Sequence, residues 1–422
     1  MTAIATGGDL RATGPLALPG SGIAGVAAGG LILASILFNA ALSILNAWVV
    51  PLNGALFTAV QGMLLAAALL VGVASGGDMR ARWIAVLWCM LLWWLFLSVL
   101  RQSLIPKSLG DIATFPIFAM LGGVLRHRTI TRMVIAVQAL VLVVGLWEAV
   151  DPPGYARLLN VASYYTNTRG ISEGEFWSEF EGLYLNSVRP VGRLFLPQLN
   201  IHRVSSLFLE PVSLGNWTVV IAIILTLFWS RLSWAERIFL FASNAALLVL
   251  CDGRFAALGI MSVVGAVTAA RWLPRSLPML FPAFVLGGLV IARRLGALPS
   301  GGDTLTGRLA KSLAYFERMT LEQAMGLVDP VPGWSFDSGW TYFSMTQSFI
   351  GILLFWIALV FMMPKSAPLG RQLVYGITAF FALNMPISNS FISIKAAAML
   401  FALYGSLMRD AISHTTVAAP QK

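Results

Sequence analysis

The chain has few of the residues on which most metal, redox and nucleophilic sites depend. Its 422 residues include only two cysteines and three histidines, and the sequence contains no HExxH, GxSxG, Walker-type or DxD motif. Cys89 and Cys251 lie in or beside apolar runs and form no CxxC pair, so neither a disulfide framework nor a cysteine metal site is indicated. We therefore expect no metal and no cofactor, and any catalysis must depend on arginines and carboxylates.

Charged residues are scarce as well. They make up 11% of the chain, and 58% of its residues are hydrophobic, whereas an average soluble protein has about 25% charged residues. A soluble core cannot bury so many apolar side chains, so the lipid bilayer must be the solvent for most of the chain. The composition predicts an all-α fold, a polytopic bundle of membrane-spanning helices.

The apolar runs predict about twelve spans, because a transmembrane helix needs about 20 predominantly apolar residues and shorter runs suffice in protected places. The fourth and eleventh runs are short and interrupted by Pro or Gly, and the fourth could be a broken or re-entrant helix. The runs lie at residues 22–47, 52–75, 83–100, 110–125, 132–149, 213–230, 235–251, 255–271, 277–293, 340–363, 372–386 and 390–408.

The distribution of Lys and Arg predicts the orientation of this bundle. The short loops on one side hold only four basic residues, Arg101, Lys107, Arg254 and Lys395, while the other side, with both tails included, holds fourteen. Because basic residues anchor cytoplasmic loops beside anionic lipid, both termini are expected in the cytoplasm. The same rule accounts for the net charge of +10, and no basic run with interleaved aromatics suggests nucleic acid as a partner.

This topology divides the chain into a flexible cytoplasmic tail at 1–21, a transmembrane domain at 22–409 and a cytoplasmic tail at 410–422. It places two long loops, 150–212 and 294–339, on the outer side, and these loops hold most of the acidic residues. Long loops in a chain with otherwise short connections are usually functional.

Both outer loops carry recognisable features. The first holds aromatic residues that could stack on sugars, namely Tyr164, Tyr165, Phe176, Trp177 and Tyr184. The second predicts a short amphipathic helix, with Leu305, Leu309, Leu313 and Phe316 on one face. A capping pattern from Thr320 to Gln323 then predicts another helical turn, which Gly326 ends. Such helices could lie on the membrane surface or cover a cavity.

The outer side also holds the ionisable residues that could carry chemistry. Arg203 and Glu210 flank the start of the sixth span, Arg254 lies in the tight turn before the eighth, and Arg308 lies on the amphipathic helix. Asp337 precedes the tenth span. Each has a simpler explanation: Arg203 and Glu210 could pair with each other, Glu210 could be an acid favoured by the helix dipole, and Arg308 could reach for the interface.

As a set, these residues describe a pocket for a polyanion attached to a lipid. Arginine binds phosphate oxygens bidentately and does not deprotonate, so Arg203, Arg254 and Arg308 could neutralise a diphosphate leaving group in place of a divalent metal. Glu210 or Asp337 could orient or deprotonate an attacking sugar hydroxyl.

Four segments of the chain resemble a known family. RVSSLFLEPVSLGNW (203–217) is similar to the "R…F.EP…G" signature that ends the long periplasmic loop of Wzy-type bacterial polysaccharide polymerases, above all the exopolysaccharide branch. GRF (253–255) resembles that family's "SR" turn, although Cys251 and Asp252 stand where a Ser often precedes the Arg. GRLAKSLAYFERMTLEQAMGL (307–327) and DSGWTYFSMTQSFIGILLFW (337–356) resemble its second periplasmic loop and the following span.

The resemblance implies a GT-C-type, metal-independent, inverting glycosyltransferase of the bacterial inner membrane. Its donor and acceptor would be undecaprenyl-diphosphate-linked oligosaccharides, and its partners would include a flippase and a chain-length co-polymerase. The superfamily also contains O-antigen ligases, which use a His in the second long loop as the base. Residues 294–339 contain no His, which favours a polymerase and leaves His202, in the first loop, as a lesser candidate base.

Two other classes of function stay open. A flippase or transporter of lipid-linked oligosaccharides would show internal repeats and ionisable groups near the bilayer midplane, whereas the charges here gather at the outer rim. A purely structural assembly subunit would not explain the set of outer arginines. We therefore expect a polymerase first, a ligase second and a transporter third.

Overall fold

The computed structural model describes residues 22–75, 77–171, 182–184, 187–188, 192–199, 201–298, 304–331 and 338–417. Within these ranges the regular structure is entirely helical, which confirms the predicted all-α class. The predicted tails lie mostly outside these ranges, and the last helix continues to Val417, past the expected boundary at residue 409.

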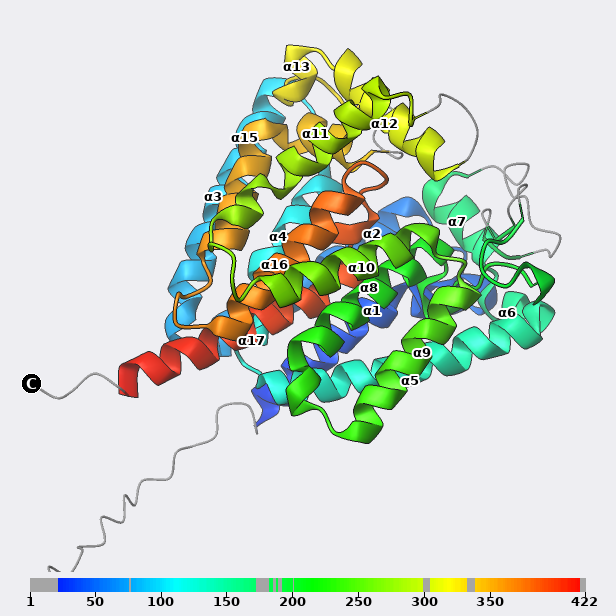
Figure 1. Cartoon of the computed structure of the whole chain (residues 1–422), viewed down its shortest axis with the longest axis horizontal. Coiled ribbons are helices and arrows are strands. Elements are labelled where there is room, and N and C mark those ends of the chain that lie inside the picture. Colours follow the sequence, from blue (N-terminus) through cyan, green and yellow to red (C-terminus); the bar gives the residue numbers. More distant parts are fainter. Residues whose placement is uncertain are drawn as a thin grey trace, which may run out of the picture.

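Long helices occupy the positions of the predicted apolar runs (Figure 1). Seven of the helices in the described ranges are long and apolar enough to cross a membrane: α1, α2, α3, α5, α8 with η5, η6 with α11, and α15. The long helices are α1 (Ile23–Trp48), α2 (Gly54–Ser75), α3 (Arg80–Arg101), α4 (Pro106–Gly122), α5 (His127–Val150), α8 (Pro211–Phe228), α9 (Trp234–Leu250), α10 (Arg254–Ala269), α11 (Phe281–Arg294), α15 (Gly339–Phe361), α16 (Pro368–Asn384) and α17 (Ile394–Val417).

Shorter helices connect them. Short α-helices lie in the two long loops, at α6 (Pro152–Leu159), α7 (Val161–Arg169), α12 (Leu305–Arg318) and α13 (Leu321–Ala324). Single 3₁₀ turns are η1 (Gly77–Met79), η3 (Pro197–Leu199), η4 (Ser206–Phe208), η5 (Trp229–Arg231), η6 (Leu277–Leu280) and η7 (Ser390–Ile392).

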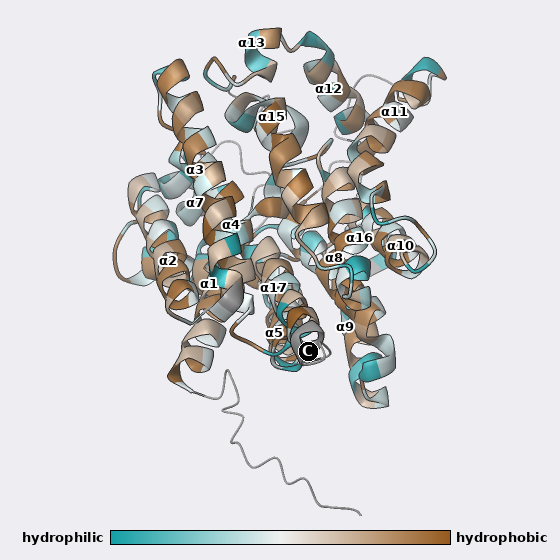
Figure 2. Ribbon diagram, turned by 90° about the vertical axis from the view of Figure 1, so that its left-hand side faces the viewer, coloured by the Kyte–Doolittle hydropathy of each residue, from teal (hydrophilic) through white to brown (hydrophobic). Residues whose placement is uncertain are grey.

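The surface of the bundle suits a membrane. Large apolar side chains such as Leu70, Phe241 and Phe284 point outward, and Figure 2 shows mostly hydrophobic residues between hydrophilic ends at the top of α11 and the bottom of α9. A contiguous apolar exterior of this kind would be a liability in water but is expected in lipid. The structure is therefore that of a helical membrane protein.

The centre of the bundle is built by α4, α8 and α17. Almost every residue of α8 is buried, whereas α11 at the periphery has no buried residue. The helices α4 and α17 cross in close contact because Gly122 and Gly405 lack side chains: a Cβ on either glycine would overlap the backbone of Ala402 or Ala119. Small residues that allow backbones to approach are typical of helix packing in membranes.

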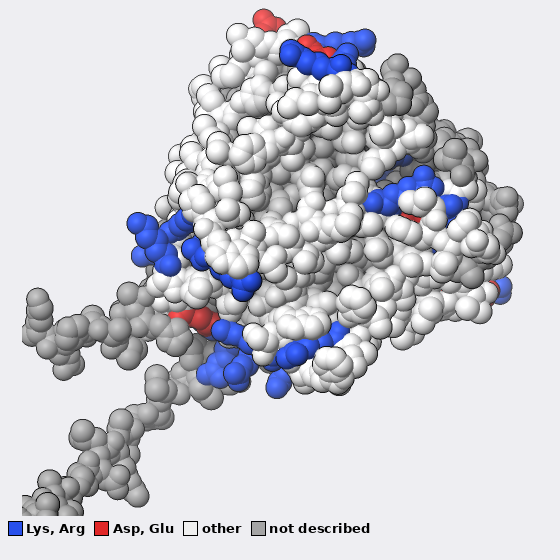
Figure 3. Space-filling view, in the orientation of Figure 1, with Lys and Arg blue, Asp and Glu red and all other residues white. Residues whose placement is uncertain are grey.

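Charged residues lie at the two ends of the bundle. The first turn of α1 and the last turn of α17 lie at the same end, at the lower left of Figure 1. Figure 3 shows groups of Lys and Arg at that end, and a second group on the right. The second group lies at the end of the bundle that the sequence predicts to be the outer one.

The amphipathic helix expected in the second long loop is confirmed as α12, and the turn after it is confirmed as α13. Thr320 and Gln323 form the predicted capping box, and Gly326, with φ at +69°, ends that turn. A backbone with positive φ suits glycine, which has no Cβ to clash.

The fourth predicted span, which could have been a broken or re-entrant helix, is not broken. Helix α4 is continuous through Pro116, and α15 is the helix that breaks, at Ser348. The backbone of Ser348 has φ +62° and ψ +166°, a conformation that is essentially restricted to glycine. Its hydroxyl accepts a hydrogen bond from the Gly351 N–H, as an N-cap residue does at the start of a helix.

Candidate functional site

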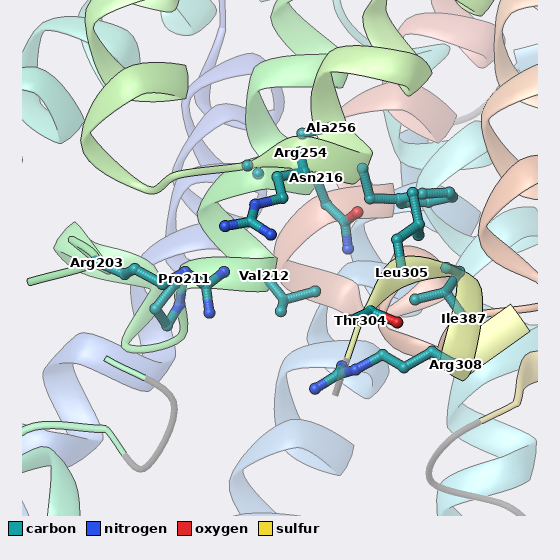
Figure 4. Close-up of a pocket in the computed structure, with 13 residues that line it drawn as sticks. Arg203, Pro211, Val212, Asn216, Arg254, Ala256, Thr304, Leu305, Arg308 and Ile387 are labelled. Atoms are coloured by element: carbon teal, nitrogen blue, oxygen red, sulfur yellow. The ribbon is translucent and has the colours of Figure 1, made fainter. Parts of the chain in front are cut away.

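Three arginines from distant parts of the chain line one pocket (Figure 4). Arg203 lies just before η4, Arg254 is the first residue of α10, and Arg308 lies in the first turn of α12. Their guanidinium groups face a shared space in Figure 4. The pocket has an empty volume of about 740 Å³, which includes the open space at its mouth. The three residues predicted to bind a diphosphate are therefore brought together.

The rest of the pocket is mostly apolar. Asn216 and Thr304 add polar groups, and Val212, Leu305 and Ile387 add aliphatic ones. Asn216 is oriented by a hydrogen bond of 2.9 Å from its Nδ2 to the hydroxyl of Ser390. A cationic pocket with an aliphatic wall suits an anion that is attached to an apolar chain.

Arg203 is buried and held by the turn between α9 and α10. Its backbone N–H donates to the Ser187 carbonyl at 2.7 Å, and its Nε donates to the Cys251 carbonyl at 3.1 Å. The next residue, Val204, donates its N–H to the Leu250 carbonyl at 3.1 Å. The segment that carries Arg203 is thus fixed to the C-terminal end of α9.

Arg254 is oriented by a buried aspartate. Its Nε lies 3.6 Å from Oδ2 of Asp252, and its Nη2 donates to the Gly192 carbonyl at 3.0 Å. Oδ1 of Asp252 accepts hydrogen bonds of 2.9 Å from the backbone N–H groups of Leu194 and Phe195. Asp252 therefore ties the first long loop to the turn that presents Arg254.

Arg193 organises the same turn from the loop side. Its guanidinium donates to the carbonyls of Ile201 and His202, at 3.1 and 2.8 Å, and to the carbonyls of Val249 and Leu250 at the end of α9. One side chain thereby ties residues 201–202 to the C-terminal end of α9.

Arg308 is positioned by the helix that carries it. Thr304 is the N-cap of α12 and accepts a hydrogen bond from the Gly307 N–H at 3.1 Å. Leu313 is buried beneath the helix, and the hydroxyl of Ser312 donates to that of Ser338 at 2.6 Å, which fixes α12 to the start of α15.

Glu210 lies beside the pocket, within an ion network of its own. Its carboxylate lies 2.7 Å from Nη2 of Arg169 and 3.3 Å from Nζ of Lys395, and it accepts a hydrogen bond of 2.7 Å from the hydroxyl of Ser213. Burial alone would raise the pKa of Glu210, but the charges of Arg169 and Lys395 outweigh it and hold the pKa well below its usual range. The structure thus gives Glu210 partners other than the Arg203 suggested by the sequence.

The Glu210 network reaches the pocket through Tyr184. Burial and the charge of Glu210 raise the pKa of Tyr184, and the positive charges of Arg169 and Arg308 oppose that rise. The ring of Tyr184 packs edge-on against Tyr165 at 5.1 Å, and the guanidinium of Arg169 lies 4.3 Å above the Tyr165 ring. Arg169 and Arg308 therefore act on the same phenol from two different helices.

His202 lies away from the residues that line the pocket. Its Nε2 is 3.2 Å from Oε1 of Glu148, a fully buried carboxylate in α5. The same carboxylate accepts hydrogen bonds from the backbone N–H groups of Ser205 and Ser206, at 3.0 and 2.6 Å. In this arrangement Glu148 anchors the segment that leads from His202 to η4.

Asp337 falls outside the described residues, as do Phe176 and Trp177 from the first long loop. The other loop aromatics are placed: Tyr164 and Tyr165 are buried in α7, where their rings meet edge-on at 5.1 Å. They form part of the core of the outer region.

Sequence reasoning missed four residues that build this site: Glu148, Arg169, Arg193 and Lys395. Glu148 carried a usable signal, because an acidic residue within an apolar run is costly unless it has a partner. Lys395 had been counted only as an outer loop cation, and the two arginines had no distinguishing pattern around them.

The arrangement can bind an anion of high charge and stabilise negative charge as it develops. Guanidinium groups that line a partly apolar pocket interact more strongly with phosphate oxygens than they would in bulk water. In the part of the chain that the structure describes, no group of three or more His, Cys, Asp or Glu residues is placed to hold a metal ion.

Comparisons with known proteins give no match: no protein-family model, curated protein sequence or solved structure is similar to this chain at a significant level.

Proposed function

We propose that the protein is a membrane glycosyltransferase that polymerises lipid-diphosphate-linked oligosaccharide units at the outer face of the bacterial inner membrane. The observation that carries this proposal is the convergence of Arg203, Arg254 and Arg308 on one pocket with an aliphatic wall. A sugar joined to a lipid through a diphosphate has both features that the pocket suits, a compact polyanion and an apolar chain.

In the proposed reaction an acceptor hydroxyl attacks the anomeric carbon of the donor sugar. A carbon–oxygen bond forms to the acceptor, the bond to the diphosphate breaks, and the lipid diphosphate leaves with the bonding electron pair. The arginines would stabilise the charge that develops on the leaving oxygen. The acceptor proton would pass to a base. Glu210 is already paired with Arg169 and Lys395, so Asp337 is the preferred candidate for this base.

The proposal includes a topology of twelve spans, formed by α1 to α5, α8 to α11 and α15 to α17, with both termini in the cytoplasm. Its support is that the helices follow the predicted runs and that the first turn of α1 and the last turn of α17 lie at one end of the bundle. The arginine pocket then lies at the outer face, where such a transferase would meet its substrates.

Reconstitution would test the proposal directly. Purified protein in lipid nanodiscs is given lipid-diphosphate-linked repeat units, and the products are separated by size. We expect a ladder of polymers from the wild type and at least a tenfold lower yield from Arg308→Ala, since about 1.5–3 kcal/mol is lost with one charged hydrogen-bonding partner. Arg318→Ala, at the exposed far end of the same helix, is the matched control and should keep wild-type yield.

Deletion of the gene separates the alternatives. Accumulated single repeat units on the lipid carrier support the polymerase. Long polymer that stays on its lipid carrier would instead identify a ligase, and repeat units trapped on the cytoplasmic leaflet would identify a flippase.

A further inference from the structure

At the break in α15, two side chains of α3 donate hydrogen bonds to backbone carbonyl groups of α15. Nη1 of Arg101 donates to the Met345 carbonyl at 3.0 Å, and Nε1 of Trp93 donates to the Gln347 carbonyl at 2.8 Å. A break at Ser348 removes the helical partners of such carbonyls, which must then find donors elsewhere. Helix α3 thus supplies the donors that stabilise the broken segment.

The outer half of α15, residues 339–347, is in turn the support of α12. The hydroxyl of Ser312 contacts that of Ser338, and the ring of Phe316 packs edge-on against Trp340 at 5.9 Å and against Phe349 at 6.0 Å. Beyond these contacts with α15, α12 packs mainly on the peripheral helix α11. The outer half of α15 therefore positions α12 and its Arg308 together with α11 and with Phe349, which lies just past the break.

Arg101 is an unusual residue in this place. It is buried at the end of a membrane helix, and its Nε and Nη2 have no hydrogen-bond partner in the described part of the chain. A buried guanidinium with unused donors is costly, so a structural role alone would be served better by a neutral donor. The negative charge of Asp329, on the loop after α13, acts on Arg101, and this carboxylate accepts a hydrogen bond from Ser103.

The turn at Gly326 also packs against the break in α15. Gly326 lies against the break, and a Cβ on it would approach the Met345 carbonyl oxygen and the Ser348 N–H nitrogen to 3.3 Å. The loop after α13, the broken segment of α15 and the end of α3 therefore meet at one point, and Arg101 contacts α15 there.

We propose that Arg101 is a positioning residue for the arginine pocket. By binding the carbonyl that the break in α15 exposes, it fixes residues 339–347 and, through them, holds α12 so that Arg308 faces Arg203 and Arg254. The inference rests on the proposed function only in that it takes an anionic, diphosphate-containing ligand as the occupant of the pocket.

A double-mutant cycle tests this role, with inorganic pyrophosphate as the probe and its binding to the purified protein measured by calorimetry. Arg101→Ala and Arg308→Ala should each weaken binding about tenfold, as expected for one charge-assisted hydrogen bond. If Arg101 acts through Arg308, the double variant should bind no more weakly than Arg308→Ala alone. The combination of Arg101→Ala with Arg203→Ala should lose more than either single variant.

Two further variants guard against a simple loss of structure. Arg101→Lys keeps a donor and a charge and should recover most of the affinity. Arg80→Ala removes an exposed arginine from the opposite end of α3 and should bind pyrophosphate as the wild type does. Full additivity of Arg101→Ala and Arg308→Ala, or unchanged binding in Arg101→Ala, would overturn the proposal.

A measurement independent of ligand separates this proposal from the proposed function. In a Cys89→Ser background, Leu305→Cys and Ala256→Cys place thiols on opposite walls of the pocket, and a short bifunctional maleimide reports how often they meet. Arg101→Ala should lower the cross-linking yield severalfold, and an unchanged yield contradicts the positioning role. A wild type that binds no pyrophosphate but shows this change in yield refutes the proposed ligand and supports the positioning role.

Discussion

The Glu210 network and the arginine pocket are neighbours at the start of α8, but the surroundings of their charged groups differ. In the network a buried carboxylate has a cation on each side, Arg169 and Lys395, and a hydroxyl from Ser213. In the pocket, three guanidinium groups line an open space. The pocket arginines have partners of their own, such as Asp252 beside Arg254, but they also line an open space in which a ligand could contact them. An ion enclosed by its partners serves structure, whereas cations that line an open space can also bind a ligand. The following predictions test that division.

The largest effect is expected from Glu210→Ala. Lys395 is the buried partner of Glu210, whereas the Arg169 side chain is 45% exposed. Removing Glu210 leaves the buried Lys395 charge uncompensated, and breaking a buried ion pair typically destabilises by about 3–5 kcal/mol. Chemical unfolding of the purified protein would measure the loss. Glu210→Gln should lose less, because the amide still accepts hydrogen bonds. A stable Glu210→Ala variant without activity would reverse the division and make Glu210 part of the chemistry.

A smaller effect on stability and a large one on ligand binding are expected at Arg203. Arg203→Ala should weaken pyrophosphate binding by about ten- to a hundredfold, and Arg203→Lys should fall between Ala and the wild type, because lysine keeps the charge but not the bidentate geometry. Calorimetric titration gives the affinities. Equal affinities for the Lys variant and the wild type would show that only charge matters at this position.

The pH dependence of stability should follow Glu210. Its pKa in the folded protein is lower than the ordinary glutamate value of 4.5, so the ionised form stabilises the fold above that value and this contribution is lost as the pH falls below it. The difference in melting temperature between the wild type and Glu210→Gln should be constant from about pH 7 to pH 5 and should shrink below about pH 4.5. A difference that already shrinks near neutral pH would contradict the assignment.

The smallest effect is expected at the ion pair between Arg293 and Glu317, which is close but about half exposed on both sides. Solvent-exposed pairs contribute about 0–1 kcal/mol, so Glu317→Gln should unfold almost as the wild type does. The same unfolding measurement serves as the matched control for Glu210→Ala. A large loss here would mean that burial is not what distinguishes the Glu210 network.

Local sequence patterns predicted the two short helices of the second long loop. The amphipathic spacing from Leu305 to Phe316 predicted α12, and the capping pattern at Thr320 predicted α13, because both depend on residues within a few positions of each other. The pocket arginines could also be named in advance, since arginines in outer loops of a chain with few charges stand out. The break at Ser348 could not, because the residue with the glycine-like backbone is itself a serine and the donors that stabilise the break come from α3.

By itself, the sequence determined that this is a helical membrane protein, because hydropathy acts over short stretches that can be read in order, and it named the arginines of the candidate site. Only the tertiary structure decided which charges meet. Lys395 reaches Glu210 across 185 residues, and Arg101 reaches Met345 across 244. Such pairings depend on how helices cross in space, and a buried charge accepts any suitable partner that the packing brings near.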